Sequence, residues 1–404
     1  MLDRPHRIPL LHLPRPVHPS CRLCITVPAK DEAAFIGETL AALYHQYDDD
    51  GVIIDRSSYE VILLANNCSD DTVAVASSFA AAHPDFCLHV MGVQLPQTIA
   101  GVGAARRMMM EAAARRLPDD GIICTTDADT IVDANWVYAT LRAFAGGARA
   151  VGGRIVVPPG IRNDYRKIYL QDVTYRLLQA QLESIIDPDH DNPWPRHFQN
   201  FGPSTAVRVD AYRACGGIPP TKCIEDVALA WALERIDVSF VHDLRIRVRT
   251  SDRDSRRIDG VAFSHQLSEW SRMLKEDRKP VVFGLDHLIK LFKWKVALRR
   301  AYYDRRIGRL PALASLTDYL KMTPAELENR ITNAPTFGAL YQDIRQLLEG
   351  THEFSNATFD EAIRGLRRFM RSAHSRPSIS SSRHRAGSVP DDPRVRDKIP
   401  AAFA

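Results

Sequence analysis

The sequence predicts an α/β protein with a mostly parallel central sheet flanked by helices and a helical C-terminal region. From residue 21 onward, short runs of aliphatic and β-branched residues alternate with segments whose apolar residues recur at helical spacing. Three of the aliphatic runs are followed directly by polar turns, as expected where parallel strands end beside a ligand site. From about residue 266 the pattern is helical, with few strand signals up to residue 348.

The alternation of the predicted elements is the argument for parallel strands. A parallel pair needs a long crossover connection, which is usually a helix. The strands are predicted at 23–27, 59–64, 88–91, 121–126 and 238–241. The helices are predicted at 32–47, 72–82, 103–116 and 227–235.

Composition narrows the class of protein. The chain has 404 residues, of which 45% are hydrophobic, and carries a net charge of +4, which is too mild to indicate a nucleic-acid partner. No apolar run reaches the ~18 residues of a membrane span. The first 20 residues lack the apolar core of a signal peptide, so we predict a cytoplasmic protein. The seven cysteines, several inside apolar runs, predict buried free thiols in a reducing compartment.

Four segments are expected along the chain. Residues 1–20 form an N-terminal leader, 21–265 the α/β domain, and 266–371 the helical region. The tail 372–404 is rich in Ser, Arg and Pro and is predicted to be disordered. Within the helical region, 285–303 reads as a basic amphipathic helix. We favour packing of its apolar side on the α/β domain over contact with an anionic membrane surface.

The acidic triplet Asp127-Ala128-Asp129 follows the fourth predicted strand. In extended backbone, residues two apart point the same way, so both carboxylates can face one cation. Carboxylate oxygens suit Mg²⁺ or Mn²⁺, which bridge to substrate phosphates. Taken alone, the triplet fits a solvated turn equally well.

Five segments occur in an order that resembles family 2 glycosyltransferases of the GT-A fold, a Rossmann-like arrangement. The resemblance covers roughly residues 21–241. Each segment is a weak signal, and the order of all five is the strong one. The segments are Pro28-Ala29-Lys30-Asp31-Glu32, Asn66 to Thr72, Gly101 to Arg106, the acidic triplet, and Gly216-Gly217 followed by Glu225-Asp226.

The resemblance implies an enzyme that moves a sugar from a nucleotide-diphosphate-sugar donor to an acceptor hydroxyl with a divalent metal. Nucleotide-pocket residues would be Pro28, Ala29 and Glu32, with Asn66 near the base. Arg106 would help to hold the donor phosphates. Asp127 would contact the ribose and, together with Asp129, the metal.

The resemblance also assigns a base and a further metal ligand. Asp226, beside Glu225, would deprotonate the acceptor hydroxyl, which makes the enzyme inverting. The plain alternative for this acidic pair is capping of the predicted helix. His242 and His265 are candidates for the additional ligand, although a lone histidine is more often structural.

Two features depart from the family pattern or extend it. Asp31 stands where the family often has Asn, and Asn66 replaces an Asp, so the base preference stays open. A basic segment surrounds Thr250-Ser251, and we expect it to be a lid over the diphosphate, a site for an anionic acceptor, or exposed loop charge. Its members are Arg245, Arg247, Arg249, Arg253, Arg256 and Arg257.

Other functions remain open at this point. A nucleotidyltransferase also uses acidic metal ligands, but the Gly-rich loop usual after its first strand is missing at 28–30. A non-catalytic sugar-nucleotide-binding protein would not need Glu225-Asp226 as well as the triplet. The acceptor could be a small molecule, a glycan or a lipid-linked group, the last of these implying peripheral contact with the inner face of the membrane. Its specificity is expected in the insert 165–200 and in the helical region.

Overall fold

The computed structural model describes residues 9–156, 163–220, 224–251, 269–270, 272–273, 275–349 and 356–374. His265 and the tail from residue 375 lie outside the described residues. The chain divides into two compact units, which are considered separately below. Unit 1 comprises Met1–Ile161 and His197–Gln266, and unit 2 comprises Arg162–Arg196 and Leu267–Ala404.

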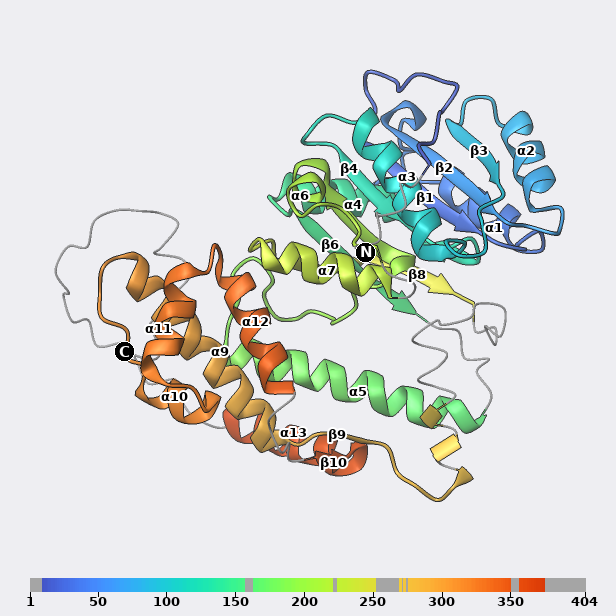
Figure 1. Ribbon diagram of the computed structural model, residues 1–404. Helices are drawn as coiled ribbons and strands as arrows, with labels where there is room; N and C mark the ends of the chain where they lie inside the picture. Colours follow the sequence, from blue (N-terminus) through green and yellow to red (C-terminus); the bar gives the residue numbers. More distant parts are fainter. Residues whose placement is uncertain are drawn as a thin grey trace. The chain divides into compact units, whose positions relative to one another are not determined.

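Unit 1 is built on an eight-stranded sheet in the order β3-β2-β1-β4-β7-β6-β8-β5 (Figure 1). The strands β1 to β4 are mutually parallel where they pair, as are β6 and β8. Only β7 and β5 run antiparallel to their neighbours, so the predicted mostly parallel sheet is confirmed. The bounds are β1 Leu23–Ala29, β2 Tyr59–Asn66, β3 Leu88–Val93, β4 Ile122–Thr125, β5 Thr130–Val132, β6 Ala150–Val156, β7 Thr205–Arg208 and β8 Phe240–Thr250.

Helices cover both faces of this sheet (Figure 1). Every residue of β1 and β2 is buried, because side chains that alternate along these strands meet a helix layer on either side. Ile25 belongs to one core and Cys24 to the other. The first core includes α1 Ile36–Tyr44, α2 Thr72–Ala82 and α4 Trp136–Ala145; the second includes α3 Val102–Arg116, α6 Val209–Ala214 and α7 Glu225–Arg235.

A buried ion-pair network lies where β2 and β3 begin. Arg116, the last residue of α3, donates from Nε (2.8 Å) and Nη2 (2.7 Å) to the two carboxylate oxygens of Glu60. Nε2 of His89 lies 3.3 Å from Oε2 of Glu60. Glu60 is only 1% exposed, so this network joins two strands to a helix end out of water.

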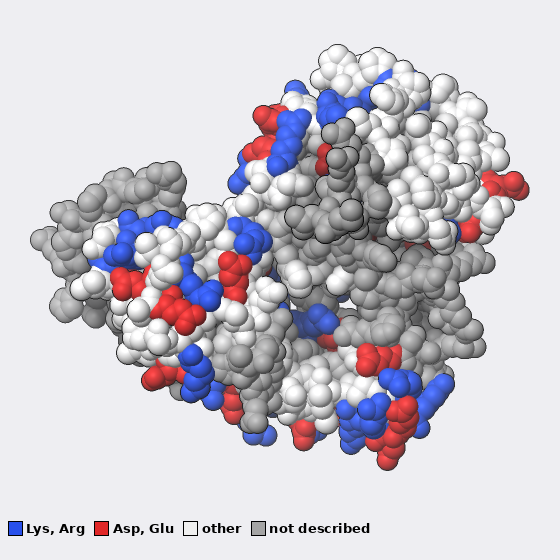
Figure 2. All heavy atoms as spheres, in the orientation of Figure 1, with Lys and Arg blue, Asp and Glu red and all other residues white. Residues whose placement is uncertain are grey.

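In the described part of unit 2 the regular structure is helical apart from the short pair β9 Val281–Phe283 and β10 Asn356–Thr358, which confirms the predicted helical C-terminal region. On the face drawn in Figure 2, positive and negative side chains are interspersed over this unit. Among the described helices, none has the length and apolarity needed to cross a membrane. The helices are α5 Asn163–Ile186, α9 Leu285–Arg306, α10 Ala314–Leu320, α11 Pro324–Asn333, α12 Phe337–Glu349 and α13 Phe359–His374.

The basic helix α9 packs inside unit 2. Its apolar side chains, such as Leu288 and Leu298, are fully buried in two cores of this unit. Lys295 pairs with Glu183 of α5 at 2.9 Å, and Arg299 pairs with Asp187 just after that helix. The 285–303 helix therefore packs partly on α5, within the predicted 21–265 domain as expected, and partly on helices of its own region. Two of its basic residues form ion pairs in the same unit.

Candidate active site

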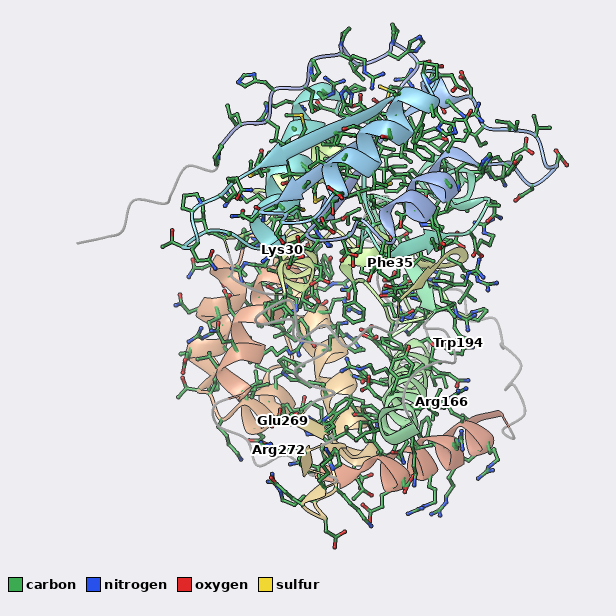
Figure 3. The ribbon with its side chains drawn as sticks, turned by 90° about the vertical axis from the view of Figure 1, so that its right-hand side faces the viewer. Lys30, Phe35, Arg166, Trp194, Glu269 and Arg272 are labelled. Carbon is green, nitrogen blue, oxygen red and sulfur yellow. The ribbon has the colours of Figure 1, made fainter. Side chains whose placement is uncertain are left out.

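The loops after β1 and β2 lie at one edge of the sheet, because both strands run in the same direction. Figure 3 shows Lys30 and Phe35 of the first loop at this edge of unit 1. Hydrogen bonds join the two loops. The carboxylate of Asp31 accepts from the backbone N–H of Ser69 (2.6 Å), and that of Asp70 accepts from the N–H of Ala33 (2.9 Å).

The residues predicted to form the nucleotide pocket are gathered at this edge. Pro28 and Ala29 end β1 and are buried. Glu32 follows them with a half-buried side chain, and its backbone N–H donates to Oγ1 of Thr72 at 2.8 Å. The structure brings these three residues together with the end of β2, where Asn66 lies.

Asn66 presents an acceptor at the end of β2. Its side chain is 4% exposed, and Nδ2 donates to the carbonyl of Gly101 at 3.3 Å. Since a carbonyl only accepts, the amide nitrogen must face it, which leaves Oδ1 on the other side. Oδ1 is buried and has no partner among the described residues. It is therefore available to an N–H group of a ligand.

The acidic triplet is fixed by three elements. The carbonyl of Asp127 accepts from the N–H of Thr130 at 3.1 Å, and the carbonyl of Ala128 accepts from Oγ1 of Thr39 on α1 at 2.8 Å. Oδ2 of Asp129 accepts a hydrogen bond from the hydroxyl of Ser251, beyond β8. Both aspartate side chains are half-buried, so the triplet is an anchored turn at the sheet edge and not a loosely solvated one.

Arg106 connects the triplet to the acidic pair of α7. Its side chain is 3% exposed. Nη2 donates to Oδ1 of Asp127 at 2.7 Å, and Nε lies 3.3 Å from Oε1 of Glu225. One cation on α3 thus holds two carboxylates that are about a hundred residues apart in the sequence.

Gly202 completes this arrangement. Its N–H donates to Oδ2 of Asp226 at 2.8 Å, while Oδ1 of Asp226 accepts from the N–H of Val227 at 2.8 Å. A Cβ built on Gly202 would lie 1.8 Å from Nη1 of Arg106, so only glycine fits against the guanidinium. The sequence carried no signal for Gly202, because its contacts are all with residues distant along the chain.

The site holds more negative than positive charge. Burial raises the pKa of Asp127; Arg106 opposes this, while Asp129, Glu225 and Asp226 raise it further, giving a pKa of about 6. Four carboxylates therefore share the neighbourhood of one guanidinium. Such an excess of hard oxygen ligands fits a divalent cation, which would relieve the repulsion.

The structure does not bring His242 to the aspartates. Thr250, at the other end of β8, pairs with Thr130 beside Asp129. His242 pairs with Gly152 and Arg249 with Val156, four residues further along β6, so His242 lies about 13 Å before Arg249 along the sheet. Its ring instead packs against that of His197, with 5.0 Å between centroids.

The basic segment is a strand for its first part. Residues 245–249 belong to β8. Ile246 and Val248 are buried on one face of the sheet, and Arg247 and Arg249 alternate with them on the other face. An alternating pattern of this kind is typical of a strand, so the expected lid or loop is wrong for residues 245–249. Arg253, Arg256 and Arg257 lie outside the described residues.

Residues 24–208 match the sequence profile "Glycosyl transferase family 2". Residues 24–208 form a glycosyl transferase family 2 domain. The match spans four of the five segments on which the resemblance depended, and the sheet with its two helix layers is the predicted GT-A arrangement. The acidic pair of α7 lies beyond the family 2 match.

Several solved glycosyltransferase structures resemble the chain. The mannosyltransferase PcManGT from Pyrobaculum calidifontis is 16% identical, with coverage of 88% of this chain and 79% of that one and a TM-score of 0.40. TarS from S. aureus is 12% identical, with 81% and 92% covered and a TM-score of 0.41. Glucosyl-3-phosphoglycerate synthase from Mycobacterium tuberculosis is 16% identical, with 68% and 89% covered and a TM-score of 0.35. No curated protein matches the chain significantly.

Proposed function

We propose that the family 2 domain transfers a sugar from a nucleotide-diphosphate-sugar donor to an acceptor hydroxyl, with inversion and with the aid of Mg²⁺ or Mn²⁺. The observation that carries this proposal is the pair of contacts from Arg106 to Asp127 and Glu225. Through them the carboxylates suited to a metal lie next to Asp226, a carboxylate suited to a base. Neither a solvated turn nor a simple helix cap requires that neighbourhood.

The metal would be held by Asp127 and Asp129. Both follow the buried strand β4 at the edge where the strands end, which is where α/β sheets bind ligands. The raised pKa of Asp127 marks the excess negative charge that a divalent ion would neutralise. The ion would supply positive charge against the leaving diphosphate.

Asp226 would act as the general base. Backbone N–H groups of Gly202 and Val227 each hold one of its carboxylate oxygens, which sets the orientation of the group. As the acceptor oxygen bonds to the anomeric carbon, its proton passes to Asp226 and the bond to the diphosphate breaks. Attack from the face opposite the leaving group inverts the anomeric centre.

Arg106 has a different proposed role from the one that the resemblance implied. Its side chain is almost wholly buried, with Nη2 bonded to Asp127 and Nη1 against Gly202. This favours positioning over phosphate contact, even though Nε and Nη1 have no hydrogen-bond partner among the described residues. We assign it as a positioning residue that sets the distance between the triplet and α7. The nucleotide itself would lie against Pro28, Ala29 and Glu32, with its base near Oδ1 of Asn66.

The first experiment identifies the donor. UDP-, GDP-, ADP- and TDP-sugars are screened by thermal shift with Mn²⁺, since a ligand that binds only the native state raises Tm by mass action. Release of nucleoside diphosphate from the donor that binds is then measured with and without chelator. Full activity in excess chelator, or in Asp129→Ala, would contradict the metal-assisted mechanism. Release of pyrophosphate from a nucleoside triphosphate would indicate a nucleotidyltransferase instead.

The second experiment tests the base. Asp226→Asn keeps the size of the side chain and removes its ability to take a proton. Donor binding should survive while turnover falls roughly 10²- to 10⁴-fold, the usual contribution of a general base. Unchanged turnover would return Asp226 to the role of a helix cap. Donor binding without turnover in the unaltered protein would indicate a sugar-nucleotide-binding protein.

A further inference from the structure

Two neighbouring strands of unit 1 place arginines side by side on one face of the sheet. Arg154 of β6 pairs in register with Arg247 of β8, and Arg249 follows two residues later on β8. All three side chains are exposed. Like charges directly opposite each other on adjacent strands repel, so this arrangement destabilises the isolated protein. A bound anion would reverse that effect.

The arginines lie on the same face of the sheet as α7. Ile155 and Val248, which alternate with them, belong to the core beneath α1 and α4. Ala150 has the same parity on β6 as Arg154, and it belongs to the core that includes α7. The arginines therefore share a sheet face with the helix whose first turn carries Asp226.

The three arginines, Arg154, Arg247 and Arg249, are called the arginine row below. One end of this row lies near the acidic triplet. Ser251, which donates to Asp129, lies two residues beyond Arg249, or about 7 Å along extended backbone. Arg247 lies about 13 Å from Ser251 on the same reckoning. The row thus begins near the proposed diphosphate site and extends away from it.

Few carboxylates neutralise this row. Arg247 lies 3.5 Å from Asp133, a partly exposed pair of the kind that contributes little. Arg154 and Arg249 have no carboxylate partner within the part of the chain that the structure describes. Arg245, by contrast, is held by both oxygens of Asp243 and is not part of the site.

We propose that Arg154, Arg247 and Arg249 bind an anionic group of the acceptor, a phosphate or a carboxylate. This inference rests on the proposed function and names the acceptor class for it. Guanidinium groups bind both kinds of anion through paired N–H donors. With the anion on this row, the acceptor hydroxyl is directed to the same sheet face as Asp226. The acceptor is therefore a charged molecule.

The test uses inorganic phosphate and glycerol 3-phosphate as probes. Glycerol, which lacks the phosphate, is the uncharged control compound. Binding to the full-length protein is followed by ³¹P line broadening for the two phosphates and by calorimetry for all three, in chelator so that the metal site takes no part. Arg154→Gln and Arg249→Gln are compared with Arg115→Gln, which removes the same charge from an exposed position on α3. None of the three residues belongs to the catalytic machinery.

The unaltered protein and Arg115→Gln should bind both phosphates and not glycerol, with affinity falling as salt rises. Arg154→Gln and Arg249→Gln should each weaken binding roughly tenfold, as for the loss of a charged hydrogen bond. Equal affinity in all variants, or no binding by the unaltered protein, would overturn the inference. Adding Mn²⁺ and the nucleoside diphosphate should leave phosphate binding intact. Competitive displacement would assign the arginines to the donor and overturn the acceptor site.

Failure of this inference is distinguishable from failure of the proposed function. Metal-dependent cleavage of the donor by water needs no acceptor, so it is measured on the unaltered protein and on Arg115→Gln. If donor cleavage is present and phosphate binding is not, only the acceptor class is wrong. If the protein neither binds nor cleaves any donor with Mn²⁺, the proposed function itself is wrong.

Discussion

Replacing Arg106 by Gln tests the central contact of the site. The substitution leaves Glu225, whose side chain is 6% exposed, as a buried carboxylate without its cation. Removing one partner of a buried ion pair typically destabilises a protein by about 3–5 kcal/mol. The Asp127 side chain is 31% exposed, so water compensates part of its loss and we expect a value at the low end, about 3 kcal/mol.

Urea unfolding measures this free energy, with Arg115→Gln on the same helix as the control. A second readout separates positioning from phosphate contact. Because Arg106 lowers the pKa of Asp127, its removal raises that pKa further above about 6. Donor binding with Mn²⁺ should then weaken at pH 7 and recover in part at higher pH, where Asp127 loses its proton.

The opposite result would refute the reasoning. If Arg106→Gln unfolds at the same urea concentration as the unaltered protein, the two ion pairs contribute nothing to the fold. If donor affinity also falls equally at every pH, Arg106 contacts the donor directly. The role implied by the family resemblance would then be right, and positioning would be wrong.

Three further outcomes are expected. Gly202→Ala should lose activity and about 1–3 kcal/mol of stability, since its Cβ would lie 1.8 Å from Arg106; normal turnover would show that the guanidinium can move aside. Burial raises the pKa of Glu60, but its bonds to Arg116 and His89 outweigh this and lower it to about 2 from 4.5. This contributes about 3 kcal/mol to the free energy of unfolding above pH 4.5, and the contribution is lost as the pH falls toward 2. In Arg116→Gln, acid unfolding should not show this decrease. For Asp127 the sign is reversed, because the metal-free folded protein keeps a proton that the unfolded chain releases. The free energy of unfolding should therefore decrease as the pH rises from about 4 to about 6, and thermal scans of Asp127→Asn should not show this decrease.

The fold class could be predicted because its signals are local. The helix predicted at 72–82 has those bounds in the structure, and the first four strands are present at the predicted places. In contrast, β7 has four residues and lies between a 3-10 turn and α6. This is too short for the two-residue alternation of a strand to be recognised in the sequence. The strand predicted at 238–241 is β8, Phe240–Thr250. Its second half alternates Arg with Ile and Val, and the high charge of this stretch hides the strand period in the sequence.

The candidate site was predictable in its members and not in its contacts. Strand ends in a parallel sheet converge by topology alone, which is why Asn66 and the acidic triplet are found together. Pairing of Arg106 with Glu225 depends on the packing of α3 against α7, and no spacing rule reports it. His242 is a candidate through the family resemblance and its residue type, and the register of β8 places it at the end of the strand away from the aspartates.

The antiparallel strand β7 has a consequence for how the two units are connected. Because β7 runs opposite to β6, the chain returns to the sheet of unit 1 after leaving it at the end of β6. Between the two strands it supplies residues 162–196 to unit 2, where α5 contributes Ile168, Tyr175 and Leu182 to one of the cores. Ending the chain after Gln266 would therefore leave α5 attached to unit 1 without the helices that bury it. The two units cannot be divided into independent proteins by cutting the chain at a single point.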